Sequence, residues 1–407
     1  MAAHAKKPPS GAHRWFVCSG SIPASEGIED KAGVFAAEGT AAHSLAAYCL
    51  ENGFDAARFV GAVAGPSGVD DDVAAVADSE TTFEVDEEMA EAVQTYLDLC
   101  RQFMVAPWEY EIEQRLDLTS VHPDIFGTGD FLAYHPNTGA LVIIDYKHGK
   151  GVPVDVHQNE QLLTYALGAA LRFHNRGLSA LDLYIVQPRC PHPDGPERHA
   201  QYDMVDLLEF RAKLAERAKR VDEATAALAT MCRADWENRY LVAGDHCGFC
   251  PRAGTCSKFR EKATALAEAE FGAGEVSELS ANKCGEILRQ AGMLKDWIRR
   301  VEQHAQSEAQ HGRLPTGFKL VAKRATRKWK NSDESLTYLR TVLELDDEQI
   351  FAAPKMKSPA QVEAVIGKKR KKALDGLYQA ISSGANLVPI EDPRPELKPD
   401  AETEFAE

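Results

Sequence analysis

The strongest constraint on the fold is a pair of short strand-like runs separated by a turn. Thr128–Tyr134 and Leu141–Lys147 are rich in strand-favouring residues, and Pro136–Gly139 between them supplies Pro, Asn and Gly, which are turn formers. The pattern predicts a β-hairpin. A turn centred in the middle of this segment places Asp130 directly opposite Asp145.

Opposed carboxylates at the end of this hairpin need a positive partner. Directly opposite side chains on paired strands have Cβ atoms about 5 Å apart, and two ionised carboxylates at that distance repel by roughly 3 kcal/mol at an effective dielectric near 20. Lys147 shares a strand face with Asp145, at the rim of a strand that is apolar on both faces. Two acids in an open geometry suit Mg²⁺ or Mn²⁺, and the lysine can orient an attacking water. The pattern indicates metal-assisted phosphodiester hydrolysis, although Asp-x-Lys by itself is also typical of a surface ion pair.

The helix predicted after the hairpin carries Gln161 and Tyr165 four residues apart on one face. One interpretation is that they form only the polar edge of an amphipathic helix. The other rests on a resemblance. Gly-x-x-Asp on one strand, Asp-x-Lys on the next and Gln-x-x-x-Tyr on the following helix resemble the PD-(D/E)XK nucleases of the RecB family. The matching residues are Gly127, Asp130, Asp145, Lys147, Gln161 and Tyr165.

The resemblance implies a restriction-endonuclease-like core and a Mg²⁺- or Mn²⁺-dependent deoxyribonuclease. Asp130 and Asp145 would bind the divalent metal, and Lys147 would position or polarise the attacking water. Gln161 and Tyr165 would hold the DNA strand or the lysine.

Candidate ligands also precede the hairpin. The resemblance implies that His43, in a Gly-x-x-x-His setting with Gly39, binds the metal from a helix ahead of the sheet. Without the resemblance, His43 reads as a structural histidine on a small-residue helix face. Glu111 and Glu113 are predicted to share one face of an earlier strand, either as neighbours of the metal site or as solvated surface.

Three cysteines, Cys247, Cys250 and Cys256, have the spacing C-x₂-C-x₅-C within a Gly- and Pro-containing loop, which indicates a metal centre. The loop offers only His246 as a further local ligand. In the iron-sulfur subgroup of the RecB family, which includes the AddB nuclease domain and CRISPR-associated exonucleases, one cysteine precedes the nuclease core and three follow it. The resemblance implies that Cys18 completes a structural [4Fe–4S] clasp, with Zn²⁺ as the alternative. The other cysteines are read as ordinary thiols.

Composition limits where nucleic acid can bind. The 407 residues are 44% hydrophobic, which is ample for a main domain with its own core and a second, smaller domain. The net charge of −16 argues against a surface that binds nucleic acid everywhere, so any groove is a local basic feature. No run approaches eighteen apolar residues and the N-terminus has no apolar signal core, so we expect a bacterial host's cytoplasm and no membrane partner.

The predicted fold class is α/β, with a mixed central β-sheet flanked by helices. Residues 1–265 are expected to form the nuclease domain with its clasp, 266–389 a smaller, mainly helical and basic accessory domain, and 390–407 a disordered acidic tail. Arg313–Lys330 is predicted as a short hairpin with a positive face that contacts phosphates, or as a solvated basic strand. Its candidate DNA-binding residues are Lys319, Lys323, Arg324, Arg327, Lys328 and Lys330.

The expected function is hydrolysis of DNA, as an exonuclease in phage or prophage recombination or replication, because most of the chain also resembles a nuclease-like family of bacteriophages and prophages. The implied partners are DNA and a phage single-strand annealing or single-strand binding protein. The alternative is a non-catalytic DNA-binding accessory protein that keeps a nuclease-like fold.

Overall fold

The computed structural model describes residues 5–28, 34–70, 81–190, 192–271, 281–322, 326–352, 355–356, 374, 376–381 and 385–389. The chain divides into two compact units, Met1–Trp297 and Ile298–Glu407. The division falls inside one long helix, α9 (Ala281–Gln310). The predicted domain boundaries at 265 and 389 stay predictions, and the predicted tail 390–407 lies outside the described residues.

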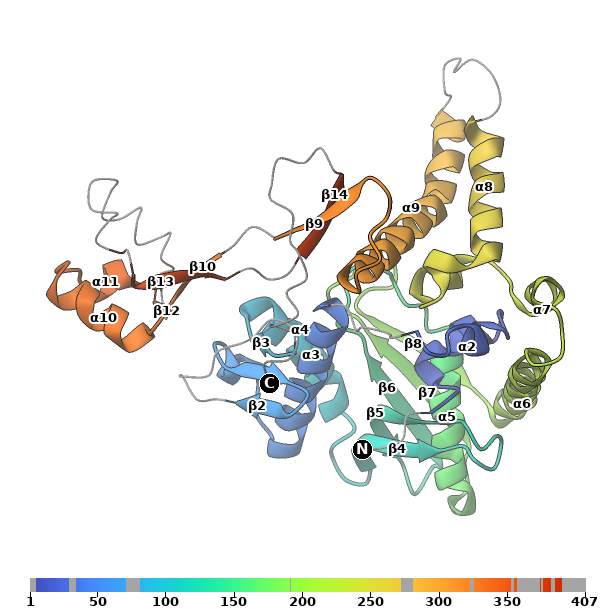
Figure 1. Cartoon of the computed structure of the whole chain (residues 1–407). Coiled ribbons are helices and arrows are strands. Elements are labelled where there is room, and N and C mark those ends of the chain that lie inside the picture. The colour runs from blue at the N-terminus through green and yellow to red at the C-terminus, as the bar shows by residue number, and fades with distance from the viewer. Residues whose placement is uncertain are drawn as a thin grey trace. The chain divides into compact units, whose positions relative to one another are not determined.

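A five-stranded sheet forms the centre of the first unit (Figure 1). Its strands, in spatial order, are β4 (Glu109–Asp117), β5 (Phe126–Tyr134), β6 (Ala140–Tyr146), β7 (Ala180–Val186) and β8 (Glu197–Tyr202). The β6–β7 pair is parallel and the other three pairs are antiparallel. The predicted α/β class with a mixed sheet flanked by helices is therefore confirmed.

The hairpin β5–β6 has the predicted turn and register. Phe131 pairs with Ile144 and Tyr134 with Leu141, so one further step in the same register puts Asp130 opposite Asp145. Gly139 in the turn has a φ of +75°, and a Cβ there would lie 2.3 Å from a backbone oxygen. This turn position therefore requires glycine.

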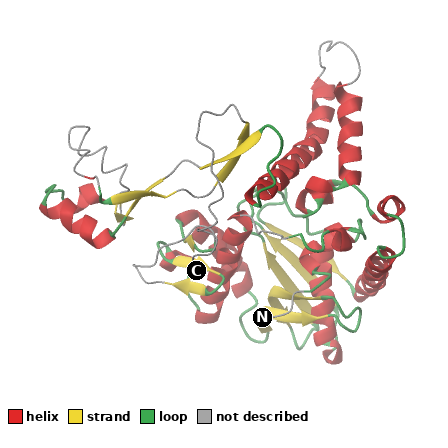
Figure 2. Ribbon diagram, in the orientation of Figure 1, coloured by secondary structure: helices red, strands yellow, loops and turns green. Residues whose placement is uncertain are grey.

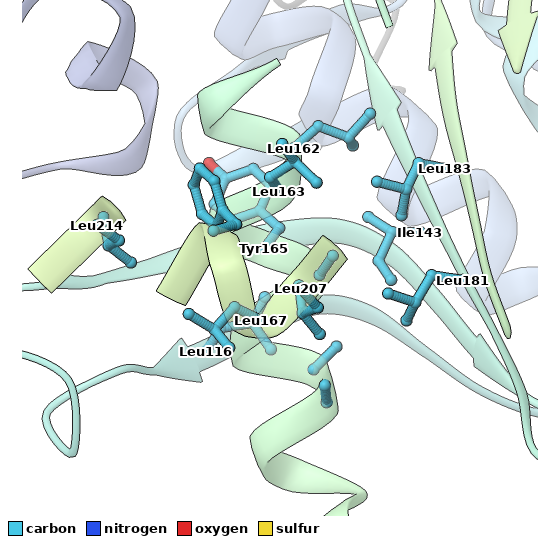
Figure 3. Close-up of a cluster of buried hydrophobic side chains, with 14 of the residues drawn as sticks. Leu116, Ile143, Leu162, Leu163, Tyr165, Leu167, Leu181, Leu183, Leu207 and Leu214 are labelled. Carbon is cyan, nitrogen blue, oxygen red and sulfur yellow. The ribbon is translucent and has the colours of Figure 1, made fainter. Parts of the chain in front are cut away.

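One face of the sheet packs against α5 (Glu160–Arg172), α1 (Ala12–Trp15) and α6 (Met204–Ala227). Helix α5 connects the parallel strands β6 and β7, and the side chain of Asn159 caps it by accepting a hydrogen bond from the Leu162 N–H. Figure 3 shows the leucines of α5 and α6 against those of the sheet. This packing places the first turns of α5 beside the end of β6, where Asp145 and Lys147 lie.

The opposite face packs against α3 (Val34–Asn52) and α4 (Glu87–Arg101). A small sheet lies beside these helices. It consists of β1 (Val63–Gly65), β2 (Gly68–Asp70) and β3 (Phe83–Glu84). Helices thus cover both faces of the central sheet (Figure 2).

The N-terminal segment contacts a much later part of the first unit, around Trp236 and Tyr240. In it, the N–H of Gly20 donates to the carbonyl of Tyr240, and Cys18 packs with Trp236 in a small buried cluster. The remaining helices of this region are α2 (Ser21–Ala24), α7 (Arg233–Tyr240) and α8 (Ser257–Phe271). No helix in the described part of the chain is long and apolar enough to cross a lipid bilayer.

The described residues of the second unit form both helices and strands, where the sequence predicted mainly helix. Leu339, Leu343 and Ile350 are the centre of its apolar cluster. The elements beyond α9 are β9 (Phe318–Ala322), β10 (Thr326–Trp329), α10 (Ser332–Thr341), α11 (Asp347–Ile350), β11 (Phe351–Ala352), β12 (Lys355–Met356), β13 (Tyr378–Ile381) and β14 (Ala385–Pro389).

The hairpin predicted within Arg313–Lys330 is wrong. Strand β9 pairs with β14, and β10 pairs with β13, so β9 and β10 do not pair with each other. Both pairs are antiparallel. The residue pairing of β10 with β13 continues that of β9 with β14, since Ala322 pairs with Ala385 and Thr326 with Ile381. Their partners lie 49 to 71 residues further along the chain. Local turn and charge patterns do not reveal a partner at that sequence distance.

Candidate functional site

Asp145, Lys147, Gln161 and Tyr165 form one connected group. Lys147 Nζ lies 2.8 Å from Asp145 Oδ2 and donates to Gln161 Oε1 at 2.9 Å. Gln161 Nε2 donates to Asp145 Oδ1 at 3.3 Å and to the Tyr165 hydroxyl at 3.1 Å. Tyr165 is buried. Gln161 and Tyr165 are therefore not just the polar edge of α5, because they contact the acid and the lysine of the sheet.

Asp130, His43 and Glu113 form a second group beside the first. His43 Nδ1, from α3, lies 3.6 Å from Asp130 Oδ1 and 3.8 Å from Glu113 Oε1. One ligand atom from each of the three residues can be chosen so that all lie within 4.8 Å of one another. The other oxygen of Asp130 accepts the N–H of Tyr146 at 2.7 Å, which fixes the carboxylate between β5 and β6.

The prediction that Glu111 and Glu113 share a strand face is wrong. Glu113 has a φ of +48°, which interrupts the alternation of side chains along β4. Glu111 pairs with Arg172 of α5 at 2.6 Å, whereas Glu113 points to His43 on the opposite side. The antiparallel register already places Glu113 opposite Asp130, and that pairing is the signal that sequence reasoning missed.

The electrostatics of the two groups reflect crowded negative charge. Burial raises the pKa of Asp145 to about 6, with the Asp130 carboxylate adding to the rise and Lys147 opposing it. Burial also raises the pKa of Asp130, Glu113 adds to it, and His43 opposes it. Burial alone lowers the pKa of His43, but Asp130 and Glu113 outweigh that effect and raise it to about 9. A bound cation would relieve this repulsion.

The donor set fits a divalent cation. Asp145 Oδ2 is buried and has the Lys147 ammonium group 2.8 Å away. Three carboxylates, from Asp130, Asp145 and Glu113, lie here beside one lysine and one histidine, so a further cation would balance the remaining negative charge. Carboxylates from three strands, together with one imidazole nitrogen, are ligands that Mg²⁺ and Mn²⁺ accept.

Gly127 of the Gly-x-x-Asp motif has a packing role. A Cβ at this position would lie 2.9 Å from Pro9 Cγ and 3.0 Å from Tyr165 Cε1. Glycine therefore lets the N-terminal segment and Tyr165 approach β5 closely.

The four cysteines predicted as cluster ligands line one small cavity. Cys18 comes from the N-terminal segment, and Cys247, Cys250 and Cys256 come from the loops between α7 and α8. Three donors on the cavity wall are buried without a hydrogen-bond acceptor among the described residues. They are Arg14 Nε, Ser21 Oγ and Arg252 Nε. Unpartnered donors around four thiols fit a negatively charged, thiolate-ligated centre.

Backbone amides point to the cysteine sulfurs. The N–H of Val242 donates to Cys18 Sγ at 3.4 Å, and the N–H of Gly244 donates to Cys247 Sγ at 3.4 Å. Burial nevertheless raises the pKa of Cys18 to about 12 and that of Cys247 to about 11, and the neighbouring cysteines add to both. A metal centre is the ordinary means of holding such buried sulfurs as thiolates.

A second group of possible ligands, His122, Asp124 and Asp222, already pairs with a lysine. Lys7 Nζ lies 3.0 Å from Asp124 Oδ2 and 2.7 Å from Asp222 Oδ1, and its side chain is only 3% exposed. This group therefore anchors the N-terminal segment and needs no metal ion.

The six candidate DNA-binding residues are only partly described. Lys323 and Arg324 lie outside the described residues, and Arg327 and Lys328 are described only as positions in β10. Lys319 is half-buried in β9 and Lys330 is exposed. Their contact with DNA stays a prediction.

Sequence comparison gives the family. A family described as "Protein of unknown function (DUF2800)" matches residues 4–395, which is nearly the whole chain. The matched range includes the four cysteines and the two groups described first, which together are called the sheet-edge site (His43, Glu113, Asp130, Asp145, Lys147, Gln161 and Tyr165). This protein therefore belongs to the DUF2800 family.

Proposed function

We propose that this protein is a metal-dependent DNA nuclease of the PD-(D/E)XK type, acting as an exonuclease in phage or prophage recombination or replication. The observation that carries the proposal is the meeting of Asp130, Asp145, Lys147 and His43 at one end of the sheet. A binding module that only holds phosphates would gain nothing from buried acids at that position.

Asp130, Asp145 and His43 would hold Mg²⁺ or Mn²⁺, with Glu113 as an additional ligand. The ion would supply positive charge that stabilises the pentavalent phosphate of the transition state. Lys147 lies beside Asp145, where its ammonium group can orient a water molecule and stabilise developing negative charge. Gln161 forms hydrogen bonds with both Lys147 and Asp145 and so fixes the position of one relative to the other. The Tyr165 hydroxyl accepts a hydrogen bond from Gln161 and fixes the amide in turn.

The cysteine cavity would hold a [4Fe–4S] cluster with a structural role. The four ligands come from positions separated by more than two hundred residues, so the cluster would tie the N-terminal segment to the loops that follow α7. Such a link stabilises the fold by restricting the unfolded chain.

An assay with end-labelled linear DNA and closed circular DNA, each with Mg²⁺ or Mn²⁺, tests the proposal. Release of labelled mononucleotides or short fragments from linear DNA, with circular DNA intact, is the expected result. Cleavage of both would make the protein an endonuclease. Integrity of both DNAs, with protein that contains its cluster and melts cooperatively, would contradict the proposal.

A further inference from the structure

Phe249 is an exposed aromatic residue in the middle of the cysteine loop. Its neighbours Cys247 and Cys250 are 6% and 8% exposed, whereas Phe249 is 57% exposed. The loop therefore turns its two ligand residues inward and this one ring outward. More than half of the Phe249 side chain is therefore accessible to a ligand.

Two residues of the N-terminal segment fix the position of Phe249. The ring of His13 meets the Phe249 ring edge-on, with centroids 6.0 Å apart and an interplanar angle of 85°. Arg14 Nη1 donates to the Phe249 carbonyl at 3.4 Å. Two contacts from α1 therefore position the aromatic pair before any ligand binds, which lowers the entropic cost of binding.

The N-terminal segment that carries His13 and Arg14 also lies against the sheet-edge site. Partial burial lowers the pKa of His13, and the charges of Arg14, His246 and Lys147 lower it further. Pro9, four residues before His13, packs on Gly127 beside Tyr165. The aromatic pair therefore follows a segment that touches the site, within reach of a nucleic-acid chain bound there. Arg14 adds a guanidinium at the backbone carbonyl of Phe249.

Aromatic rings among basic groups are the usual platform for unpaired nucleobases. A base inside a duplex already stacks on its neighbours, whereas an unpaired base can stack on a protein ring, for a gain of about 1–3 kcal/mol per base. Phosphates beside that base would meet the basic groups around the ring.

We propose that Phe249 and His13 form a stacking site for an unpaired base at a DNA end, so that the protein takes ends with a single-stranded extension in preference to blunt duplex ends. This inference rests on the proposed nuclease function and names its substrate class.

Equilibrium binding in EDTA, where metal-dependent cleavage cannot occur, tests the inference. The probes share one labelled duplex and differ at the end, which is blunt, carries a single-stranded extension on either strand, or carries an extension of abasic residues. The variants are Phe249→Ala, Phe249→Trp and His13→Ala. Val105→Ala is the matched control, because Val105 is also 57% exposed and lies before β4, near the hairpin-turn end of the sheet.

We expect the wild type to bind the extended end about tenfold more tightly than the blunt or abasic end. Phe249→Ala and His13→Ala should lose most of that preference, and Phe249→Trp and Val105→Ala should keep it. Iron content reports whether each cysteine loop is intact, and His13→Ala decides the matter if Phe249→Ala loses iron, because His13 lies outside that loop. Unchanged preference in both alanine variants would overturn the inference.

The same measurements separate this inference from the nuclease proposal. A wild type that cleaves DNA but binds all ends equally would reject the stacking site and leave the nuclease proposal standing. A wild type that neither binds nor cleaves any DNA would reject both.

Discussion

Lys147 Nζ lies 2.8 Å from Asp145 Oδ2, so the two residues form a close ion pair. The lysine also donates to Gln161, whose amide group donates to the other oxygen of Asp145. A second buried acid, Asp130, lies beside this pair on the adjacent strand. This geometry holds a lysine and two acids side by side, as metal-assisted hydrolysis requires.

Gln161 is predicted to position Lys147. Gln161→Ala should lower kcat for DNA hydrolysis about 10- to 100-fold, because loss of the amide frees both Lys147 and Asp145. The matched control is Gln201→Ala, whose exposed side chain donates to Asp182 on the neighbouring strand. Steady-state kinetics on linear DNA measure both. Equal activity of Gln161→Ala and the wild type would remove Gln161 from the site.

Glu113 is predicted to contribute to metal affinity. Glu113→Gln should raise the Mg²⁺ concentration needed for half-maximal activity about tenfold, because one anionic oxygen of the group is lost. Glu111→Gln, two residues away on the same strand, should leave that concentration unchanged, since Glu111 pairs with Arg172. Activity measured across a range of Mg²⁺ concentrations tests the pair of variants. Identical responses would contradict the assignment of Glu113.

The cysteine cavity is predicted to hold iron and sulfide. Protein purified without oxygen should be brown and contain iron and sulfide near four per chain, as a cubane cluster requires. Cys18→Ser and Cys247→Ser should lose the colour and melt at a lower temperature. Cys232→Ser should keep both, because Cys232 is exposed and serine can replace it as the cap of α7. A colourless wild type with stoichiometric zinc would contradict the cluster.

Lys7 is predicted to stabilise the first unit. Lys7→Ala should lower the free energy of unfolding by about 3 kcal/mol, near the lower end for a broken buried pair because Asp222 is half-exposed. The exposed neighbour Lys6 is the matched control, and Lys6→Ala should have little effect. Denaturant unfolding measures both variants.

The Lys7 effect should also depend on pH. Burial alone raises the pKa of Asp222, but hydrogen bonds from Lys7 and His122 outweigh burial and lower it below its ordinary value. Stability from a carboxylate with a lowered pKa is present above its unfolded value of about 4 and is lost as the pH falls through the folded value. The difference between the wild type and Lys7→Ala should therefore shrink below about pH 4. A constant difference from pH 7 to pH 3 would exclude the ion pairs as its cause.

Local sequence rules predict the centre of the fold. The turn residues fix the β5–β6 register, and the periodicity of leucines predicts α5, so the positions of Asp130, Asp145 and Gln161 follow from the sequence. The spacing of three cysteines predicts a common centre. Cys18 joins them in the structure, as the family resemblance implied.

Features that depend on distant or unusual backbone do not follow from local rules. Glu113 reaches His43 because its positive φ reverses the direction of its side chain, which an alternating pattern does not reveal. The ion pairs of Lys7 join residues more than one hundred positions apart. The partners of β9 and β10 are similarly distant, which is why the predicted hairpin there is wrong.

The most direct test of the account is DNA hydrolysis by Asp145→Asn, measured with end-labelled linear DNA and Mg²⁺. Asparagine has nearly the same shape as aspartate but lacks its charge, so the variant should fold, keep its iron and lose at least about a thousandfold in kcat. Lys147→Met should fail in the same way, with the fold again checked by its melting transition. Wild-type rates in either folded variant would contradict the central claim that these two residues perform the hydrolysis.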